Sequence, residues 1–205
     1  SPLDSLPQTT GIVCNDAGAA NIIFSWIRYG SKPALVFASG PALNILNRDH
    51  ELLNKVQIVD SIDELISQCS KLITGTGWQT DQEISAVQSA RLQDKYVISV
   101  IDHWTNYKDR FLLKGKLVLP AEIWVTDIWA LKIAHKEFGE TPIELQLNTY
   151  ATDLVRQIKS IEPIPRKLLY VAEPIRNPQN MPEKSELEAF KYFLNHAPDE
   201  NIDLA

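Results

Sequence analysis

Cysteine and long apolar runs are both scarce in this chain of 205 residues. Its two cysteines, Cys14 and Cys69, lack C-x-x-C spacing and sit among apolar neighbours. So few thiols exclude a disulfide scaffold and indicate buried core residues in a reducing compartment. No apolar run approaches the roughly 18 residues that a membrane-spanning helix needs. The opening residues also lack the basic and apolar regions of a signal peptide, so we expect a cytoplasmic location and no membrane span.

An excess of positive charge is missing as well. The chain has 20 Lys and Arg against 26 Asp and Glu, and its net charge is −6. The basic residues are scattered rather than clustered, so we expect no nucleic-acid partner. Phosphate is not excluded by this balance, because helix N-termini bind it without net positive charge. With 44% hydrophobic residues, the composition predicts one sizeable core.

The usual signatures of a metal or a dinucleotide are absent from the sequence. His50, His135 and His196 show no ligand spacing, so we predict no metal site. The first glycine turn, Asn15-Asp16-Ala17-Gly18-Ala19-Ala20-Asn21, does not match G-x-G-x-x-G, and the usual dinucleotide site is unsupported. We therefore predict no cofactor.

Short apolar runs alternate with helical patterns along the first 160 residues. The predicted strands are 11–15, 34–38, 56–59, 72–74, 96–101, 122–125 and 143–147. The predicted helices are 19–29, 62–69, 82–93, 128–138 and 152–160. Most strands are continuously apolar, as expected for strands buried on both faces. The series predicts an α/β fold with a doubly wound, mostly parallel, Rossmann-like sheet.

A break is predicted near residue 160, where Pro163 and Pro165 suit an extended crossing between domains. Residues 1–160 are expected to form the Rossmann-like amino-terminal domain. Residues 161–205 read as the crossing and the beginning of a second, truncated domain, with a strand at 167–172 and a helix at 185–196. Alternatively, this last helix folds back on the first domain.

The first glycine turn leaves a strand and enters a helix. Gly18 is small enough for a ligand to approach the backbone closely, and Asn21 lies one turn further on. Asp16 opposes an anion there unless it acts as a base or binds sugar hydroxyls. The alternative is that Asp16 only caps the helix and the small residues serve packing.

The second turn, Thr74-Gly75-Thr76-Gly77-Trp78, also ends a strand. Gly75 and Gly77 allow close approach, and Trp78 could stack on a sugar or base. Asp81 and Glu83 follow, and the spacing of Thr80 and Glu83 fits a capping box. We favour a capping role for the two acids over a functional one.

The third strand end carries the densest polar and aromatic cluster, with Asp102, His103, Trp104, Asn106 and Tyr107. Aromatic faces and hydrogen-bonding side chains together suit carbohydrate. His103 could act as an acid–base group, although a direct pair with Asp102 requires a turn. The alternative is a structural loop.

Two further strand ends present polar groups. Asp127 is predicted to cap the helix that contains Trp129, and Asn148 follows the last strand of the series. Because parallel strands end on one edge of a sheet, we expect Gly18 and Gly77 to share a crevice with Asp16, Trp78 and His103.

These segments resemble the amino-terminal half of GT-B-type sugar enzymes, in particular bacterial surface-polysaccharide glycosyltransferase-like proteins and the UDP-N-acetylglucosamine 2-epimerases. The resemblance spans residues 11–174. It rests on the segments 15–21, 74–77, 102–104, 119–127 and 168–174. It implies that this domain binds the acceptor and supplies a base, while a second domain binds the nucleotide sugar.

The resemblance thus implies a sugar-transfer enzyme, or its acceptor-binding half, acting in surface polysaccharide or glycoconjugate synthesis. Its partners would be a nucleotide-sugar donor and a carbohydrate acceptor, and a homodimer is left open. Asp16 or His103 would be the catalytic base. The substrate-binding residues would be Gly18, Asn21, Gly75, Gly77, Trp78, Asp102, Trp104, Asn106, Tyr107 and Asn148. The alternatives are a non-catalytic nucleotide- or sugar-binding module and a nucleotide-sugar epimerase or hydrolase.

Overall fold

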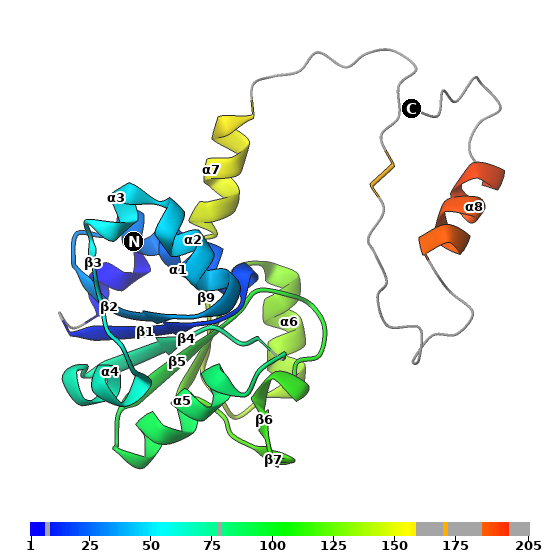
Figure 1. Ribbon diagram of the computed structural model, residues 1–205. Coiled ribbons are helices and arrows are strands. Elements are labelled where there is room, and N and C mark those ends of the chain that lie inside the picture. The colour runs from blue at the N-terminus through cyan, green and yellow to red at the C-terminus, as the bar shows by residue number, and fades with distance from the viewer. Residues whose placement is uncertain (7–8, 78, 159–169, 172–185, 197–205) are drawn as a thin grey trace. The chain divides into compact units, whose positions relative to one another are not determined.

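The computed structural model describes residues 1–6, 9–77, 79–158, 170–171 and 186–196. The chain separates into two units, Ser1–Gln157 and Ile158–Ala205. The first unit contains the sheet and all residues of the candidate site (Figure 1).

Seven parallel strands form the sheet of the first unit, in the order β3-β2-β1-β4-β5-β8-β9. The strands are β1 (Thr10–Cys14), β2 (Ala34–Ala38), β3 (Val56–Ile58), β4 (Lys71–Thr74), β5 (Tyr96–Ile101), β8 (Glu122–Val125) and β9 (Ile143–Leu145). The central strands β1, β4, β5 and β8 are almost entirely buried, which explains their continuously apolar sequences. This sheet confirms the predicted α/β, Rossmann-like class.

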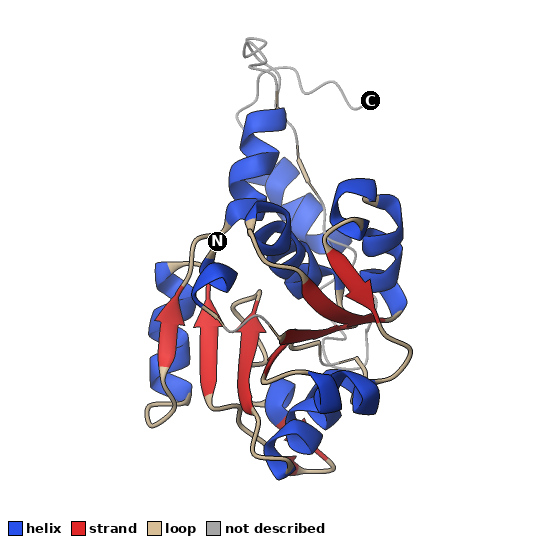
Figure 2. Cartoon of the chain, turned by 90° about the vertical axis from the view of Figure 1, so that its left-hand side faces the viewer, coloured by secondary structure: helices blue, strands red, loops and turns tan. Residues whose placement is uncertain are grey.

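Helices cover both faces of the sheet (Figures 1 and 2). One face carries α1 (Ala17–Tyr29), α2 (Gly40–Arg48) and α3 (His50–Leu53), which share a core with Ile12, Val36 and Ile98. The other carries α4 (Ile62–Gln68), α5 (Gln82–Leu92) and α6 (Ile128–Glu137), which share a second core with Val13, Val97 and Ile123. Neighbouring residues of one strand thus point into different cores, as the pleat requires.

The order of the strands creates a switch point between β1 and β4. From β1 the chain enters α1 on one face, whereas from β4 it enters α5 on the other. The two loops therefore diverge at the carboxyl edge of the sheet, the place where open α/β sheets bind ligands.

The predicted elements agree with the observed ones to within a few residues. The strands at 34–38, 96–101 and 122–125 are reproduced without change. The largest shift is in α7 (Thr149–Gln157), which begins three residues before the predicted start at Thr152 because Asn148 accepts a hydrogen bond from the Ala151 amide at 2.9 Å.

The helix pair α2 and α3 and the short hairpin of β6 (Leu112–Leu113) and β7 (Lys116–Leu117) were not predicted. Gly40 and Pro41 suggest a turn, yet proline is tolerated in the first turn of a helix, where its missing N–H has no partner to lose. The helical spacing of the buried residues Ala42 and Leu46 was the available signal.

The second unit contains one described helix, α8 (Glu186–His196), close to the predicted 185–196. The predicted strand at 167–172 falls largely outside the described residues, and its described members Tyr170 and Val171 carry no strand assignment. The prolines of the predicted crossing also lie outside them. The start of a second domain after residue 160 therefore stays a prediction.

Candidate functional site

A buried carboxylate joins the two loops at the switch point. Glu83 lies in the first turn of α5 and is 1% exposed. Its Oε1 accepts the Asn15 amide at 2.9 Å, and its Oε2 accepts the Gly77 amide at 2.5 Å. One side chain thus satisfies amides after both β1 and β4, which fixes the two turns against each other.

This arrangement corrects the predicted capping roles in α5. The N-cap residue is Asp81 rather than Thr80, and its side chain makes no capping hydrogen bond. Glu83 does not complete a capping box, because its carboxylate reaches across to the loop after β1. Local spacing could not reveal this partner, which lies 68 residues away in the sequence.

The two glycines of the second turn are needed because Glu83 lies against them. A Cβ on Gly75 would be 2.2 Å from Glu83 Oε1, and one on Gly77 would be 2.8 Å from Oε2 and 2.9 Å from the Cβ of Asp16. Gly75 and Gly77 therefore permit close approach, as predicted, but what approaches in the structure is the protein's own carboxylate.

The first turn meets the third at a second close contact. Asp16 is the N-cap of α1, and its Oδ2 accepts the Gly18 amide at 3.1 Å. A Cβ on Gly18 would be only 1.8 Å from Asp102 Oδ2. Asp16, Gly18 and Gly77 thus come together at one place, as predicted, and Asp102, which the predicted crevice did not include, lies with them. The capping interpretation of Asp16 is confirmed, and this leaves its chemical role as a prediction.

Arg110 is the buried cation that faces these acids. It is 6% exposed, and its Nη1 donates to Asp102 Oδ1 at 3.0 Å and to the Thr76 carbonyl at 2.8 Å. Its Nε donates to the Thr105 carbonyl at 3.1 Å. The guanidinium therefore links the loops after β4 and β5. Sequence reasoning missed both Glu83 and Arg110 as members of the site, because each has its partners through long-range or loop contacts.

The electrostatics of the site are dominated by burial and by negative charge. Burial raises the pKa of Glu83 above its ordinary value, and the amides of Asn15 and Gly77 oppose this rise. Burial also raises the pKa of Asp102, with Arg110 lowering it and the neighbouring charge of Asp16 raising it further. The site thus has three carboxyl groups, those of Asp16, Glu83 and Asp102, against one guanidinium that pairs with Asp102, and this excess favours ligands with hydroxyl groups over a phosphate.

The polar edge extends to Ser39 and Gln82. The side-chain Nδ2 of Asn15 donates to Ser39 Oγ at 2.8 Å and to Gln82 Oε1 at 3.3 Å. Ser39 also donates to Gln82. These side chains follow β1 and β2 or begin α5, so the turn after β2 also belongs to this edge.

The polar and aromatic residues that follow β5 lie in different surroundings. His103 and Trp104 are exposed, and His103 Nδ1 lies 3.1 Å from Thr105 Oγ1. Asp102 and His103 make no direct pair, since the carboxylate of Asp102 contacts Arg110. Trp104 Nε1 donates to Asp127 Oδ2 at 2.9 Å.

The remaining predicted residues are more dispersed. Tyr107 is 4% exposed, and its ring stacks on Phe138 in the core. Asn106 is exposed with a φ of +57°, and its carbonyl accepts the Arg110 amide. Asn21 is half-buried in α1, and Asn148 donates to Thr126 Oγ1 at 3.4 Å.

Trp78 lies outside the described residues, so its predicted place in the crevice is not described. The two cysteines are buried, as predicted, and burial raises the pKa of Cys14 well above its ordinary value. Within the described part of the chain, no group of three His, Cys, Asp or Glu residues could hold a metal ion.

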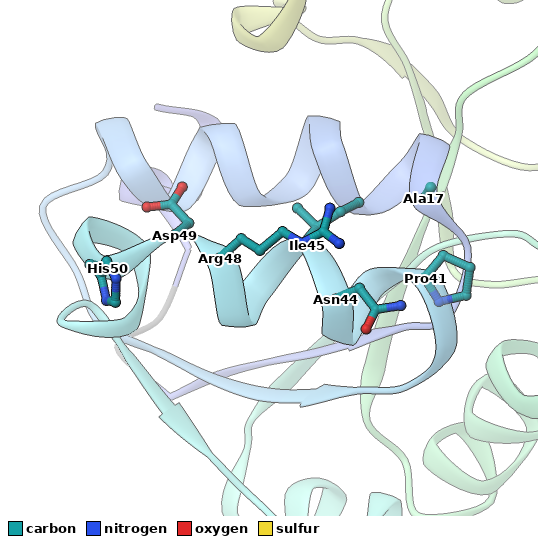
Figure 3. A pocket seen from close by; sticks show the side chains of 7 residues that line it. All are labelled: Ala17, Pro41, Asn44, Ile45, Arg48, Asp49 and His50. Atoms are coloured by element: carbon teal, nitrogen blue, oxygen red, sulfur yellow. The ribbon is translucent and has the colours of Figure 1, made fainter.

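An open groove of about 540 Å³ runs beside the site, between α1, α2 and α3 (Figure 3). It begins at Ala17, directly after Asp16, and extends past Asn44 and Arg48 to His50. Asp49, also on its wall, forms an ion pair with Arg28. An open groove that contains the basic side chain of Arg48 thus begins next to Asp16.

Comparisons of the chain with family models, curated proteins and solved structures gave no match. The fold is a Rossmann-like sheet of seven parallel strands. No helix within the described ranges is long and apolar enough to cross a membrane.

Proposed function

We propose that this chain is the acceptor-binding half of a GT-B-type sugar-transfer enzyme, acting with a nucleotide-activated sugar in surface polysaccharide or glycoconjugate synthesis. The observation that carries the proposal is the meeting of Asp16, Gly18, Gly77 and Asp102 at the switch point. This is where an open α/β sheet binds its ligand.

The charge of this place suits an acceptor better than a donor. The site holds the carboxyl groups of Asp16, Glu83 and Asp102, and Arg110 pairs with Asp102, so the excess of negative charge disfavours a nucleotide diphosphate. A neutral sugar has hydroxyl groups, and carboxylates can accept hydrogen bonds from them. The donor is therefore assigned to another part of the whole enzyme.

Asp16 is the proposed base. Its carboxylate is oriented by a hydrogen bond from the Gly18 amide. Because Gly18 has no side chain, nothing from that residue covers the carboxylate. A hydroxyl proton passes to Asp16 as the hydroxyl oxygen bonds to the anomeric carbon of the donor. The bond from that carbon to the nucleotide phosphate breaks, and the nucleotide leaves with the electron pair. His103, exposed beside Trp104, is the second candidate base.

One observation favours a second candidate function, a binding module without catalysis. Asp16 already caps α1, and Asp102 is already paired with Arg110. Both carboxylates thus have structural partners, which a module that only binds nucleotides or sugars would equally need.

The test is turnover by the intact protein with a panel of nucleotide sugars, measured as release of free nucleotide. We expect Asp16→Asn to lose roughly 10²–10⁴-fold in rate, because the amide cannot take the proton. The amide oxygen can still cap α1, so the fold should persist by circular dichroism. His103→Ala tests the other base.

Asp81→Asn is the matched control, since Asp81 is an exposed N-cap residue whose side chain makes no capping bond. It should keep the wild-type rate. If the folded Asp16 and His103 variants both keep that rate too, neither is the base, and the binding module becomes the better reading.

A further inference from the structure

The tryptophans of this chain fall into two groups. Of the four that the structure describes, Trp26 and Trp124 are 0% and 3% exposed, and Trp104 and Trp129 are 57% and 64% exposed. The buried indoles donate to the Leu147 carbonyl and to Glu122. Leaving two of the largest apolar side chains in water is unfavourable, which points to a role at the surface.

A single carboxylate holds both exposed tryptophans. Asp127 Oδ2 accepts the Trp104 indole N–H at 2.9 Å, and Asp127 Oδ1 accepts the Trp129 backbone amide at 2.8 Å. Asp127 is also the N-cap of α6, so its own position is fixed. We name Trp104, Trp129 and Asp127 the tryptophan platform.

Polar groups surround the rings of the platform. The His103 ring lies 6.1 Å from the Trp104 ring, and Lys132 Nζ lies 4.5 Å from the centre of the Trp129 ring. Ring faces flanked by hydrogen-bonding groups suit a ligand with C–H faces and hydroxyl groups. A purely apolar partner would leave His103 and Lys132 without partners on binding.

The platform lies on the same edge of the sheet as Asp16, Glu83, Asp102 and Arg110, which we name the acidic cluster. Trp104 follows β5 and Trp129 follows β8, and these strands are parallel neighbours with Ile101 opposite Val125. Asp102, which borders Gly18, is two residues before Trp104. A chain of sugars could therefore cover the platform while one end reaches the cluster.

We propose that the tryptophan platform binds a neutral sugar ring of an acceptor oligosaccharide by stacking. The proposal deepens the proposed function and rests on it for the direction of the acceptor. It adds Trp129 and Asp127, which sequence reasoning treated as a helix residue and its cap.

The test uses the whole 205-residue chain and the indole N–H signals of its tryptophans in nuclear magnetic resonance. Cellohexaose, maltohexaose and chitohexaose are the probes. At least one should shift the signals of Trp104 and Trp129, assigned by their loss in Trp104→Phe and Trp129→Phe. Those of the buried Trp26 and Trp124 should stay in place.

Affinity for the responding probe should fall about tenfold in Trp104→Ala and in Trp129→Ala, equivalent to about 1.4 kcal/mol each. The phenylalanine variants keep a ring and should recover part of the loss. Tyr29→Ala is the matched control, because Tyr29 is a half-exposed ring at the last residue of α1, at the opposite end of that helix from Asp16. It should bind as the wild type does.

Three results would overturn the proposal: no probe shifts either signal, both alanine variants bind normally, or the signals shift with protein concentration alone. The last would assign the platform to contacts between copies of the chain. Binding and turnover separate the two proposals. Oligosaccharide binding by the chain, with no nucleotide-sugar turnover by the whole enzyme that contains the donor-binding part, leaves the platform standing and rejects the transferase. If both alanine variants keep normal turnover and normal oligosaccharide binding, the transferase stands and the platform is rejected.

Discussion

The acidic cluster and the tryptophan platform lie on one edge of the sheet but are built in opposite ways. In the cluster, Glu83 and Arg110 are almost fully buried and bind backbone groups of neighbouring loops. In the platform, Trp104 and Trp129 are more than half exposed and depend on one carboxylate. The first region should therefore govern stability, and the second should govern binding at the surface.

The comparison also shows that the acids at the switch point take part in contacts that hold the fold together. Each acid in the cluster has a partner that stabilises the fold, so a loss of activity there would be mixed with a loss of stability. In the platform, a substitution of either tryptophan should change binding with little change in stability. Substitutions in the two regions should separate by their effect on unfolding.

The largest effect is expected from Arg110→Leu. It leaves the half-buried Asp102 carboxylate without its cation and the Thr76 and Thr105 carbonyls without a donor. We expect a loss of about 3–5 kcal/mol in the free energy of unfolding, measured by urea denaturation. Adding Asp102→Asn should recover part of it, because the unpaired charge is then gone.

Arg48→Leu is the control for this prediction, since Arg48 is exposed on the groove between α1 and α2. It should change stability by no more than about 0.5 kcal/mol. Similar losses in the Arg110 and Arg48 variants would show that the buried pair does not set the cluster apart.

An intermediate effect is expected from Glu83→Gln, at about 1–3 kcal/mol. The amide of glutamine would present its NH₂ to one of the two backbone amides that the carboxylate accepts, at Asn15 or Gly77. The measurement is again urea denaturation, now as a function of pH.

The direction of the pH dependence follows from the raised pKa of Glu83. A carboxyl group whose pKa is higher in the folded state makes its full contribution below its ordinary value of 4.5, and that contribution falls as pH rises toward the folded pKa. The stability advantage of the wild type over Glu83→Gln should therefore shrink above pH 4.5. An advantage that grows with pH would mean that the backbone amides outweigh burial.

The smallest of these effects is expected in the platform, from Asp127→Ala. It removes the cap of α6 and the acceptor of the Trp104 indole, for a loss of about 1 kcal/mol. Asp81→Ala removes an N-cap residue whose side chain makes no capping bond and should leave stability unchanged. Equal losses in both variants would contradict the role given to Asp127.

The sheet could be predicted because its signals are local. The strands 96–101 and 122–125 are runs of apolar residues whose length and composition suit burial on both faces. The N-cap at Asp127 depends on neighbours two to three residues away, and it was recognised. The helix α2 was missed because Gly40 and Pro41 resemble a turn, although proline is compatible with a helix start.

The members of the site could be predicted only in part. Asp16, Gly18 and Gly77 were expected together because each follows a parallel strand, and the structure brings them together with Asp102, the sequence neighbour of the expected His103. Glu83 was assigned to local capping, and Arg110 was not assigned at all. Their partners lie on other loops, so no spacing within the sequence identifies them.

The sequence by itself determined the alternation of strands and helices, because a buried parallel strand is a run of consecutive apolar residues. That alternation also fixed the edge on which the glycine turns and the polar residues lie. Only the tertiary structure decided which side chains meet there. Glu83 joins Asn15 to Gly77, Arg110 joins Asp102 to Thr76, and Asp127 joins Trp104 to Trp129. The first two of these links, and that from Asp127 to Trp104, depend on how neighbouring strands are ordered in the sheet, and a pattern with a period of two or 3.6 residues carries no record of that order.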